Sequence, residues 1–176
     1  TTASTITTLT HTASSKIDLG ADLTITNGFA VGANNTLFLN NTGALGGGAI
    51  NLNAGTSVLR RNGVGNVTAA VTFGGAGAKL DVDANSTFSG AFTMNANSVF
   101  DIAAGTTLTV AAFNIGANTL DVQGTGTLAA AGAIELNVAN SELQKTGTGI
   151  VSAPLTFSGD SAILNCDANS TFSGAF

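Results

Sequence analysis

The chain repeats itself at a long, fixed interval. The segment DANSTFSGAF occurs at residues 83–92 and again at residues 167–176, an offset of 84 residues in a chain of 176. The match extends upstream, because 15 of the 22 residues in 71–92 are identical to their counterparts in 155–176. Self-similarity at a fixed period is the sequence signature of a repeat architecture, and it constrains the fold more than any other feature of this sequence.

The repeat also predicts how the chain is organised. We expect residues 1–8 to be the end of a preceding repeat or a leader, residues 9–92 to form a first repeat of four coils, and residues 93–176 to form a second. The two repeats should make one continuous solenoid. The second repeat would end flush with the last residue, which suggests a segment of a longer array.

A shorter period lies inside each repeat. Apolar residues flanking one other residue form triplets that recur every 20 to 23 residues, with Leu59 and Leu143 marking weaker ones. The clear triplets are Ile17-Asp18-Leu19, Leu37-Phe38-Leu39, Leu80-Asp81-Val82, Phe100-Asp101-Ile102, Leu120-Asp121-Val122 and Leu164-Asn165-Cys166. Alternate side chains of a strand point to opposite faces, so each triplet predicts a short strand with its outer two residues inside.

This period favours a parallel β-solenoid over other all-β folds. A short strand cannot bury its inner face alone, but coils stacked on one another bury a continuous core. About eight coils of about 21 residues would give a rod about 40 Å long at the usual strand spacing. An antiparallel β-sandwich is the alternative, since its turns come every 8–12 residues. The recurrence of one outward residue type at about 21 residues favours the solenoid.

Composition excludes several classes of function. Charged residues make up only 9% of the chain, and its net charge of −5 argues against a nucleic-acid partner, which would need a basic face. One cysteine cannot form an internal disulfide, and one histidine weakens any mechanism built on a histidine base. The uncharged stretch 23–59 is too rich in Asn and Thr to predict a membrane span.

Four aspartates hold the middle place of a predicted triplet: Asp18, Asp81, Asp101 and Asp121. In a solenoid the last three would stack on successive coils, which could make a ladder of carboxylates for a hard cation. The alternative is a solvated acidic edge that prevents lateral sheet pairing. We favour the edge, because a calcium site needs six to eight oxygens and no second row converges here. The sequence therefore predicts no metal, cofactor-binding or catalytic residue.

Basic residues interrupt the same coil of both repeats. Arg61 and Lys145 are 84 residues apart and stand where strict alternation would point them inward. Because a buried unpaired charge is costly, we expect the backbone to bend there and release both side chains to solvent. We also expect Arg60 to pair with Asp81 on the next coil, an exposed contact that contributes about 0–1 kcal/mol.

Two reactive residues have structural interpretations. His11 lies in a Thr- and Ser-rich segment, and the second repeat has no histidine, so we expect a surface residue. Cys166 is the counterpart of Val82 and is expected to be a small buried apolar residue.

Other solenoid functions fit less well. A polysaccharide-active enzyme would need paired carboxylates and usually aromatic platforms, but the chain has no Trp or Tyr. An ice-binding face would need Thr-x-Thr at one position of every coil, and the motifs at residues 24–26, 107–109, 125–127 and 146–148 do not share one. We therefore expect no enzymatic activity.

Several motifs carry a family resemblance. Residues 142–149 (ELQKTGTG), followed by residues 155–159 (LTFSG), resemble the autotransporter-associated β-strand repeat, and so do the NSTFSG segments at 85–90 and 169–174. The bias towards Thr, Asn, Gly and Ala is similar to that of passenger regions of rickettsial-type surface antigens. In the first repeat, residues 61–65 (RNGVG) replace the lysine-led version.

The resemblance implies a rigid rod displayed on a bacterial surface or secreted, acting as an adhesin stalk or as a spacer, with a host-cell or matrix receptor as a possible partner. The alternative is a self-assembling extracellular filament or surface-layer subunit. Natural solenoids need polar caps, and neither end of this sequence has a charged cap segment, so subunits could stack through open ends.

Overall fold

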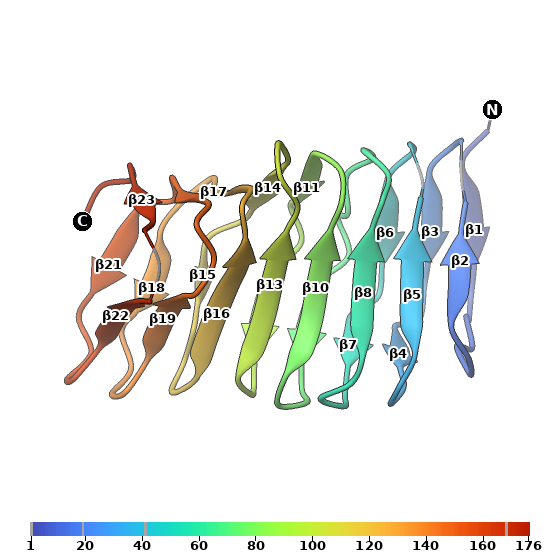
Figure 1. Ribbon diagram of the computed structural model, residues 1–176. Coiled ribbons are helices and arrows are strands. Elements are labelled where there is room, and N and C mark those ends of the chain that lie inside the picture. Colours follow the sequence, from blue (N-terminus) through green and yellow to red (C-terminus); the bar gives the residue numbers. More distant parts are fainter. Residues whose placement is uncertain (1, 19, 41, 168) are drawn as a thin grey trace.

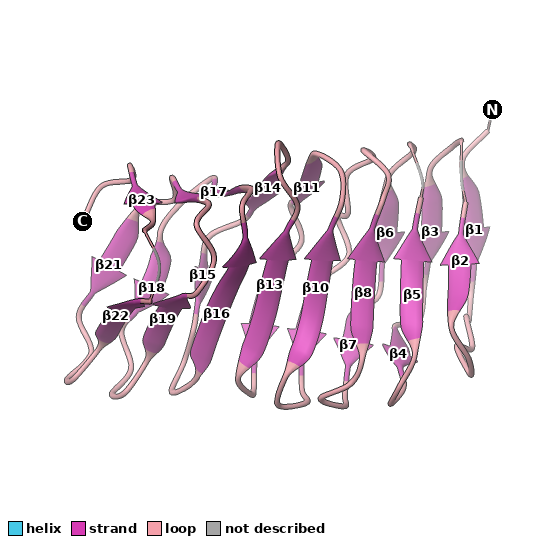
Figure 2. Ribbon diagram, in the orientation of Figure 1, coloured by secondary structure: helices cyan, strands magenta, loops and turns pink. Residues whose placement is uncertain are grey.

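The chain is an all-β parallel solenoid of about eight turns, with N- and C-termini at opposite ends of the rod (Figure 1). The computed structural model describes residues 2–18, 20–40, 42–167 and 169–176. Strands joined by short loops make up these residues, and Figure 2 shows no helix among them. None of the described residues belongs to a helix that could cross a membrane. The predicted solenoid is confirmed, and the alternative sandwich is excluded because every strand pair is parallel.

One face of the rod is an unbroken eight-stranded sheet, called here the long sheet. Its strands run side by side along the front of Figure 1, one from each coil. They are β2 (Ser15–Ile17), β5 (Thr36–Leu39), β8 (Val58–Arg61), β10 (Ala78–Val82), β13 (Ser98–Ile102), β16 (Thr119–Gly124), β19 (Glu142–Lys145) and β22 (Ile163–Cys166).

A second face follows the long sheet in each coil. Its strands are β1 (Ser4–Ile6), β3 (Leu23–Ile25), β6 (Leu45–Gly47), β11 (Ser86–Phe88), β14 (Thr107–Val110), β17 (Thr127–Ala130), β20 (Ile150–Val151) and β23 (Thr171–Phe172). Val67 bridges β6 to β11 through single pairings with Leu45 and Phe88, so the ladder continues along this face.

A third face completes each coil. Its strands are β4 (Phe29–Val31), β7 (Ile50–Leu52), β9 (Val71–Phe73), β12 (Phe92–Met94), β15 (Phe113–Asn114), β18 (Ile134–Leu136) and β21 (Leu155–Phe157). The first four pair in one sheet and the last three in another.

Alternation within the strands builds the core. In β10, for example, Ala78, Leu80 and Val82 are fully buried while Lys79 and Asp81 lie between them on the outer side. The same pattern along the rod gives one continuous cluster of buried apolar residues. Burial of this kind contributes about 25 cal/mol per Å² of apolar surface, which explains how strands of two to six residues are stable together but not alone.

The junction between the two repeats is the most aromatic part of the core. Phe73, Phe88, Phe92, Phe100 and Phe113 contact one another with ring centroids 5.4 to 6.1 Å apart. These rings come from strands on both sides of residue 92. The core is therefore packed through the repeat boundary.

Glycines let neighbouring coils approach closely at the corners. A Cβ atom on Gly65 would collide with the carbonyl oxygen of Gly43, and one on Gly149 would collide with that of Gly126. These glycines are 84 residues apart and follow the long sheet in the third and seventh coils. The GxG motifs of the sequence are thus sites of backbone contact between coils.

Candidate functional site

Charge is concentrated on the outer surface of the long sheet. Lys16, Arg60, Lys79, Asp81, Asp101, Asp121 and Glu142 all point outward from its strands. The strands of the second face contain no charged residue, and those of the third face contain only Glu135. The outer surface of the long sheet is therefore the candidate functional site, and it is called the charged face below.

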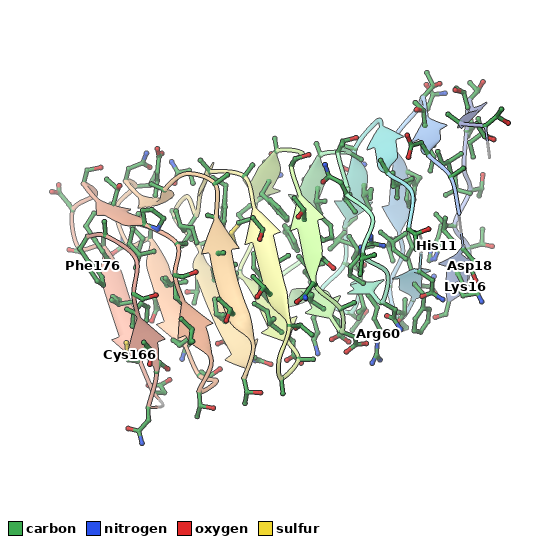
Figure 3. The ribbon with its side chains drawn as sticks, turned by 90° about the horizontal axis from the view of Figure 1, so that it is seen from above. His11, Lys16, Asp18, Arg60, Cys166 and Phe176 are labelled. Carbon is green, nitrogen blue, oxygen red and sulfur yellow. The ribbon has the colours of Figure 1, made fainter. Side chains whose placement is uncertain are left out.

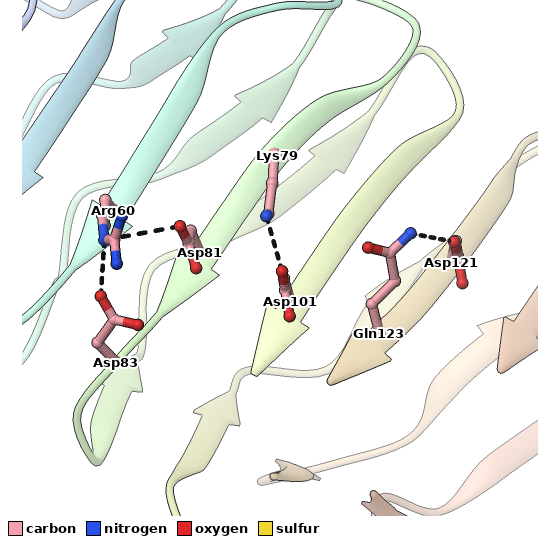
Figure 4. A network of polar contacts seen from close by, with 7 residues as sticks. All are labelled: Arg60, Lys79, Asp81, Asp83, Asp101, Asp121 and Gln123. Atoms are coloured by element: carbon pink, nitrogen blue, oxygen red, sulfur yellow. Dashed lines mark hydrogen bonds and ion pairs between the residues drawn. The ribbon is translucent and has the colours of Figure 1, made fainter. Parts of the chain in front are cut away.

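Arg60 on β8 joins the charged face to the next coil, where both of its partners lie on or directly after β10 (Figure 4). Its Nε lies 2.6 Å from Oδ2 of Asp83 and 3.6 Å from Oδ2 of Asp81. The Asp83 contact raises the pKa of Arg60, while partial burial raises the pKa of Asp81 despite the opposing effect of Lys79 and Arg60. The predicted Arg60–Asp81 pair is confirmed, and Asp83 is a closer partner that the sequence analysis missed.

Lys79 makes the next ion pair along the rod. Its Nζ lies 2.7 Å from Oδ2 of Asp101 on the following coil, and both side chains are about one third exposed. Asp81 and Asp101 are direct register partners, so the first part of the predicted aspartate stack is present. The basic side chains of Arg60 and Lys79 lie beside these two carboxylates and pair with them.

Beyond Asp101 the charged face changes character. Asp121 accepts hydrogen bonds from Gln123 at 2.6 Å and from Thr146 at 2.7 Å, both through neutral donors. Gln144 donates to Asp167 at 2.8 Å, and Thr119 donates to Glu142 at 3.0 Å. In the sixth to eighth coils, amides and hydroxyls thus take the place that Arg60 and Lys79 hold earlier.

Asp121 does not stack on Asp101, contrary to the sequence prediction. The register partner of Asp101 is Gln123, whereas Asp121 lies beside Val99. Asp18 is also displaced, because Lys16 pairs in register with Phe38 and Asp18 follows β2, where it is exposed and 3.1 Å from Lys16. Both errors are slips of two residues. A slip of two leaves every side chain on its own face, so alternation alone could not detect it.

The four aspartates are therefore not a single ladder. No group of three or more His, Cys, Asp or Glu residues in the described part of the chain could hold a metal ion. Asp18, Asp81 and Asp101 have cationic partners, and Asp121 has neutral ones. The charged face is chiefly a surface of internal polar contacts.

Arg61 is buried, which corrects the prediction that the backbone would release it. Its side chain is fully inaccessible and points into the solenoid, where Nη1 donates to the carbonyl of Leu39 at 3.0 Å and Nη2 donates to the carbonyl of Gly65. Burial lowers the pKa of Arg61 to about 10, so the group stays protonated at neutral pH. Main-chain oxygens at the corner meet its charge without any bend of the strand.

Lys145 repeats this arrangement in the seventh coil. It is also fully buried, and its Nζ donates to the carbonyls of Val122 at 3.2 Å and Gly147 at 2.7 Å. Burial lowers the pKa of Lys145, and the nearby charge of Asp121 opposes that shift. The prediction that Lys145 points to solvent was wrong for the same reason as for Arg61. The sequence signal was the GxG pair that follows each cation.

Two other predictions concern the ends of the rod, where Figure 3 labels His11 and Cys166. His11 is half-buried, both ring nitrogens are buried, and burial lowers its pKa, so it is not a simple surface residue. Cys166 is exposed rather than buried. It lies in register with the inward Lys145, but β22 is the last strand of the long sheet and no further strand covers it.

Sequence reasoning missed most of the polar partners on the charged face. Asp83, Lys79, Gln123, Glu142 and Gln144 were not singled out, although each lies within two residues of a marked triplet. The repeat itself held a signal, because Arg60 and Asp83 have Gln144 and Asp167 as counterparts 84 residues on. Two residue pairs that keep the same spacing are a sign of a contact between coils.

Comparison with known proteins adds no relative. No protein-family model matches the chain, and searches of curated proteins and of solved structures found no significant match.

Proposed function

We propose that this chain is a structural rod in a bacterial cell-surface or secreted protein, where it acts as a rigid spacer for display or adhesion. The observation that carries the proposal is the unbroken eight-stranded sheet from β2 to β22. Each coil pairs with the next through parallel strands, so the number of coils sets the length of the rod. A rod of this kind holds two sites at a fixed distance, and added coils lengthen that distance. A compact globular domain cannot be lengthened by adding repeats in this way.

The chemistry of the charged face supports a structural role over a catalytic one. Its carboxylates accept hydrogen bonds or ion pairs from neighbouring coils, as Asp101 does from Lys79. Contacts of this kind fix the coils to one another. We assign the chain no catalytic residue.

The likeness of its motifs to autotransporter-associated repeats supports an extracellular or cell-surface location. A host-cell or matrix receptor is the partner that this location would suggest. The charge-free second face and the charged face give such a rod two chemically distinct sides along its length.

The spacer role has a direct test. The chain would be displayed between a cell-surface anchor and an epitope, with and without one additional in-register copy of residues 9–92. Four added coils should move the epitope outward by about 19 Å at the usual strand spacing. A flexible Gly- and Ser-rich insert of equal length is the matched control. The flexible insert would spread the epitope over a broad range of distances, with a root-mean-square span of about 50 Å. An epitope whose distances are as broadly spread as in the control, instead of narrowly centred near the rigid value, would reject the rigid spacer. Saturable binding of the purified chain to matrix proteins would support a role in adhesion in addition to the spacer role.

End-to-end assembly is a second candidate function, favoured by the terminal coils. Ile163 and Phe176 in the last coil are 45% and 72% exposed, and Ile6 near the other end is 37% exposed. Electron microscopy and light scattering across a concentration series would decide. Filaments would support a self-assembling subunit, and single rods at high concentration would reject it.

A further inference from the structure

A shallow pocket of about 250 Å³ opens on the charged face where its character changes. It lies over the fifth to seventh coils, and the lining residues used below are Asn97, Val99, Thr119, Asp121, Glu142 and Gln144. The pocket is not part of the spacer function proposed above. Its lining combines two carboxylates, neutral amides and hydroxyls, and one short apolar side chain.

The register of the long sheet explains why the pocket exists. Lys79, Val99, Asp121 and Gln144 form one outward row across four consecutive coils. Val99 is the shortest of them, and Lys79 is directed to Asp101, 2.7 Å away. The space above Val99 is therefore bordered by Asp121 on one side. Glu142 stands diagonally beyond it, because Glu142 pairs with Thr119.

Both carboxylates keep acceptor capacity for a ligand. The oxygens of Asp121 receive one hydrogen bond each, from Gln123 and Thr146, and those of Glu142 receive one each, from Thr119 and Asn165. A carboxylate can accept about four hydrogen bonds. All four donors are neutral. The nearest buried cation, Lys145, points to the other side of the sheet and donates to main-chain carbonyls.

The first repeat shows what group fits on this face. Arg60 donates to Asp83 at 2.6 Å, and its counterpart Gln144 donates to Asp167 at 2.8 Å in the same arrangement. Lys79 presents a primary ammonium to Asp101 in the adjoining coil. At the Arg60 position the second repeat keeps the acceptor, Asp167 in place of Asp83, and has an amide where the first has a cation. Asp121 and Glu142 correspond to the apolar Leu37 and Val58 of the first repeat, so it is the contact between Lys79 and Asp101 that shows that an ammonium group fits against a carboxylate on this face.

We propose that this pocket binds the primary ammonium group of a small linear amine. The ammonium donates to Asp121 and Glu142, the amide of Gln144 borders it, and the methylene chain of the amine contacts Val99. This arrangement reproduces the contact between Lys79 and Asp101 with an external ammonium group. Because the site is open to solvent, binding is weak and decreases with added salt.

Titration of the full chain with spermidine, followed by amide NMR, tests the proposal. At about 20 mM salt we expect saturable shifts centred on residues 97–99, 119–121 and 142–144, with a dissociation constant on the order of 1 mM. Asp121→Asn and Glu142→Gln should each weaken binding about two- to fivefold. Gln144→Arg, which installs the residue of the first repeat, should also weaken it, because its guanidinium adds a positive charge beside the site that repels the ammonium group.

Glu135→Gln is the matched control, since it removes the same charge from the third face. It should leave the dissociation constant unchanged. Shifts spread evenly over all carboxylates, no saturation, or equal weakening by Glu135→Gln and Glu142→Gln would overturn the proposal. Tighter binding of a trilysine peptide than of spermidine would overturn the assignment to a small amine and point to lysine side chains of a protein partner. None of these results depends on whether the rod is a spacer.

Discussion

Arg61 in the first repeat and Lys145 in the second are equivalent in sequence, and both are buried with main-chain carbonyls as partners. Outside the sheet, the equivalent residues Arg60 and Gln144 differ in charge yet make the same contact with Asp83 and Asp167. The buried position thus holds a cation in both repeats, whereas the exposed position holds a cation in the first repeat and a neutral amide in the second. Coil stacking constrains the buried position, because its side chain must fill space in the core and donate hydrogen bonds to main-chain carbonyls at the corner. The outer position needs only a hydrogen-bond donor.

Removing the buried cations should destabilise both repeats, because the buried cation is the feature that the two repeats share. Arg61→Ala and Lys145→Ala each leave a cavity and deprive a corner carbonyl of its partner. We expect a loss of about 3–4 kcal/mol in the free energy of unfolding for each. Denaturant unfolding monitored by circular dichroism would measure it. Arg61→Lys and Lys145→Arg should cost much less, and equal losses from these exchanges would contradict the proposed role of the cation.

The corner glycines should show a similar equivalence with a smaller effect. Gly65→Ala and Gly149→Ala each place a Cβ atom against a main-chain carbonyl of the preceding coil. Such overpacking typically costs about 1–3 kcal/mol. Gly20→Ala is the control, because a Cβ atom there would have no heavy atom of another described residue within 4 Å, its chain neighbours aside. Thermal unfolding of the three variants would compare them. A Gly149→Ala variant as stable as Gly20→Ala would mean that the seventh coil is looser than the third.

Exchanging the outer residues should sharpen the contrast between repeats. Arg60→Gln copies the second repeat and Gln144→Arg copies the first, and the hydrogen bond to the next coil should survive both changes. We expect each exchange to change stability by only about 0.2–1 kcal/mol, because the side chain of Arg60 is 41% exposed. The effect of charge should shrink with added salt, which urea unfolding at two salt concentrations would show. A salt-independent loss would mean that packing, rather than charge, holds Arg60.

Much of the fold could be predicted, for reasons visible in particular residues. Leu80, Val82, Phe100 and Ile102 alternate with polar residues and recur at the coil period, which determines strand, face and stacking together. The register between the fifth and sixth coils could not be predicted from that pattern. Moving Asp121 by two residues keeps it outside, so the choice depends on how Phe100 packs against Val122.

The candidate site was harder to predict than the fold. The sequence predicts the pair between Arg60 and Asp81, because the two residues lie one coil apart, but it does not predict the burial of Arg61. Its hydrogen bond to the Gly65 carbonyl depends on the path of the corner, which no side-chain pattern records. The pocket over Val99 depends on the register slip and was likewise out of reach.

The smallest expected effect is a pH dependence of stability in the first repeat, which contains His11 and differs in this from the second repeat. Burial lowers the pKa of His11 below 6.5, so its neutral form is favoured in the folded state. The stability it contributes is complete above pH 6.5 and is lost as the pH falls through the lowered pKa. Hydrogen exchange should therefore show the first coil opening more readily in mild acid. His11→Asn, which installs the residue found at Asn95 of the second repeat, should abolish that change, and its persistence would exclude His11 as the cause.

The direction of the hydrogen bonds in the long sheet has a mechanical consequence. These bonds join one coil to the next and so lie along the rod, and under a pull on the two chain ends we expect the outermost coils to detach first, because β2 and β22 pair with a strand on one side only. The rod should resist bending and compression yet unwind one turn at a time under tension. Each turn of about 21 residues would release about 70 Å of extended chain. Such a segment would be a stiff strut at rest and an extensible tether under load.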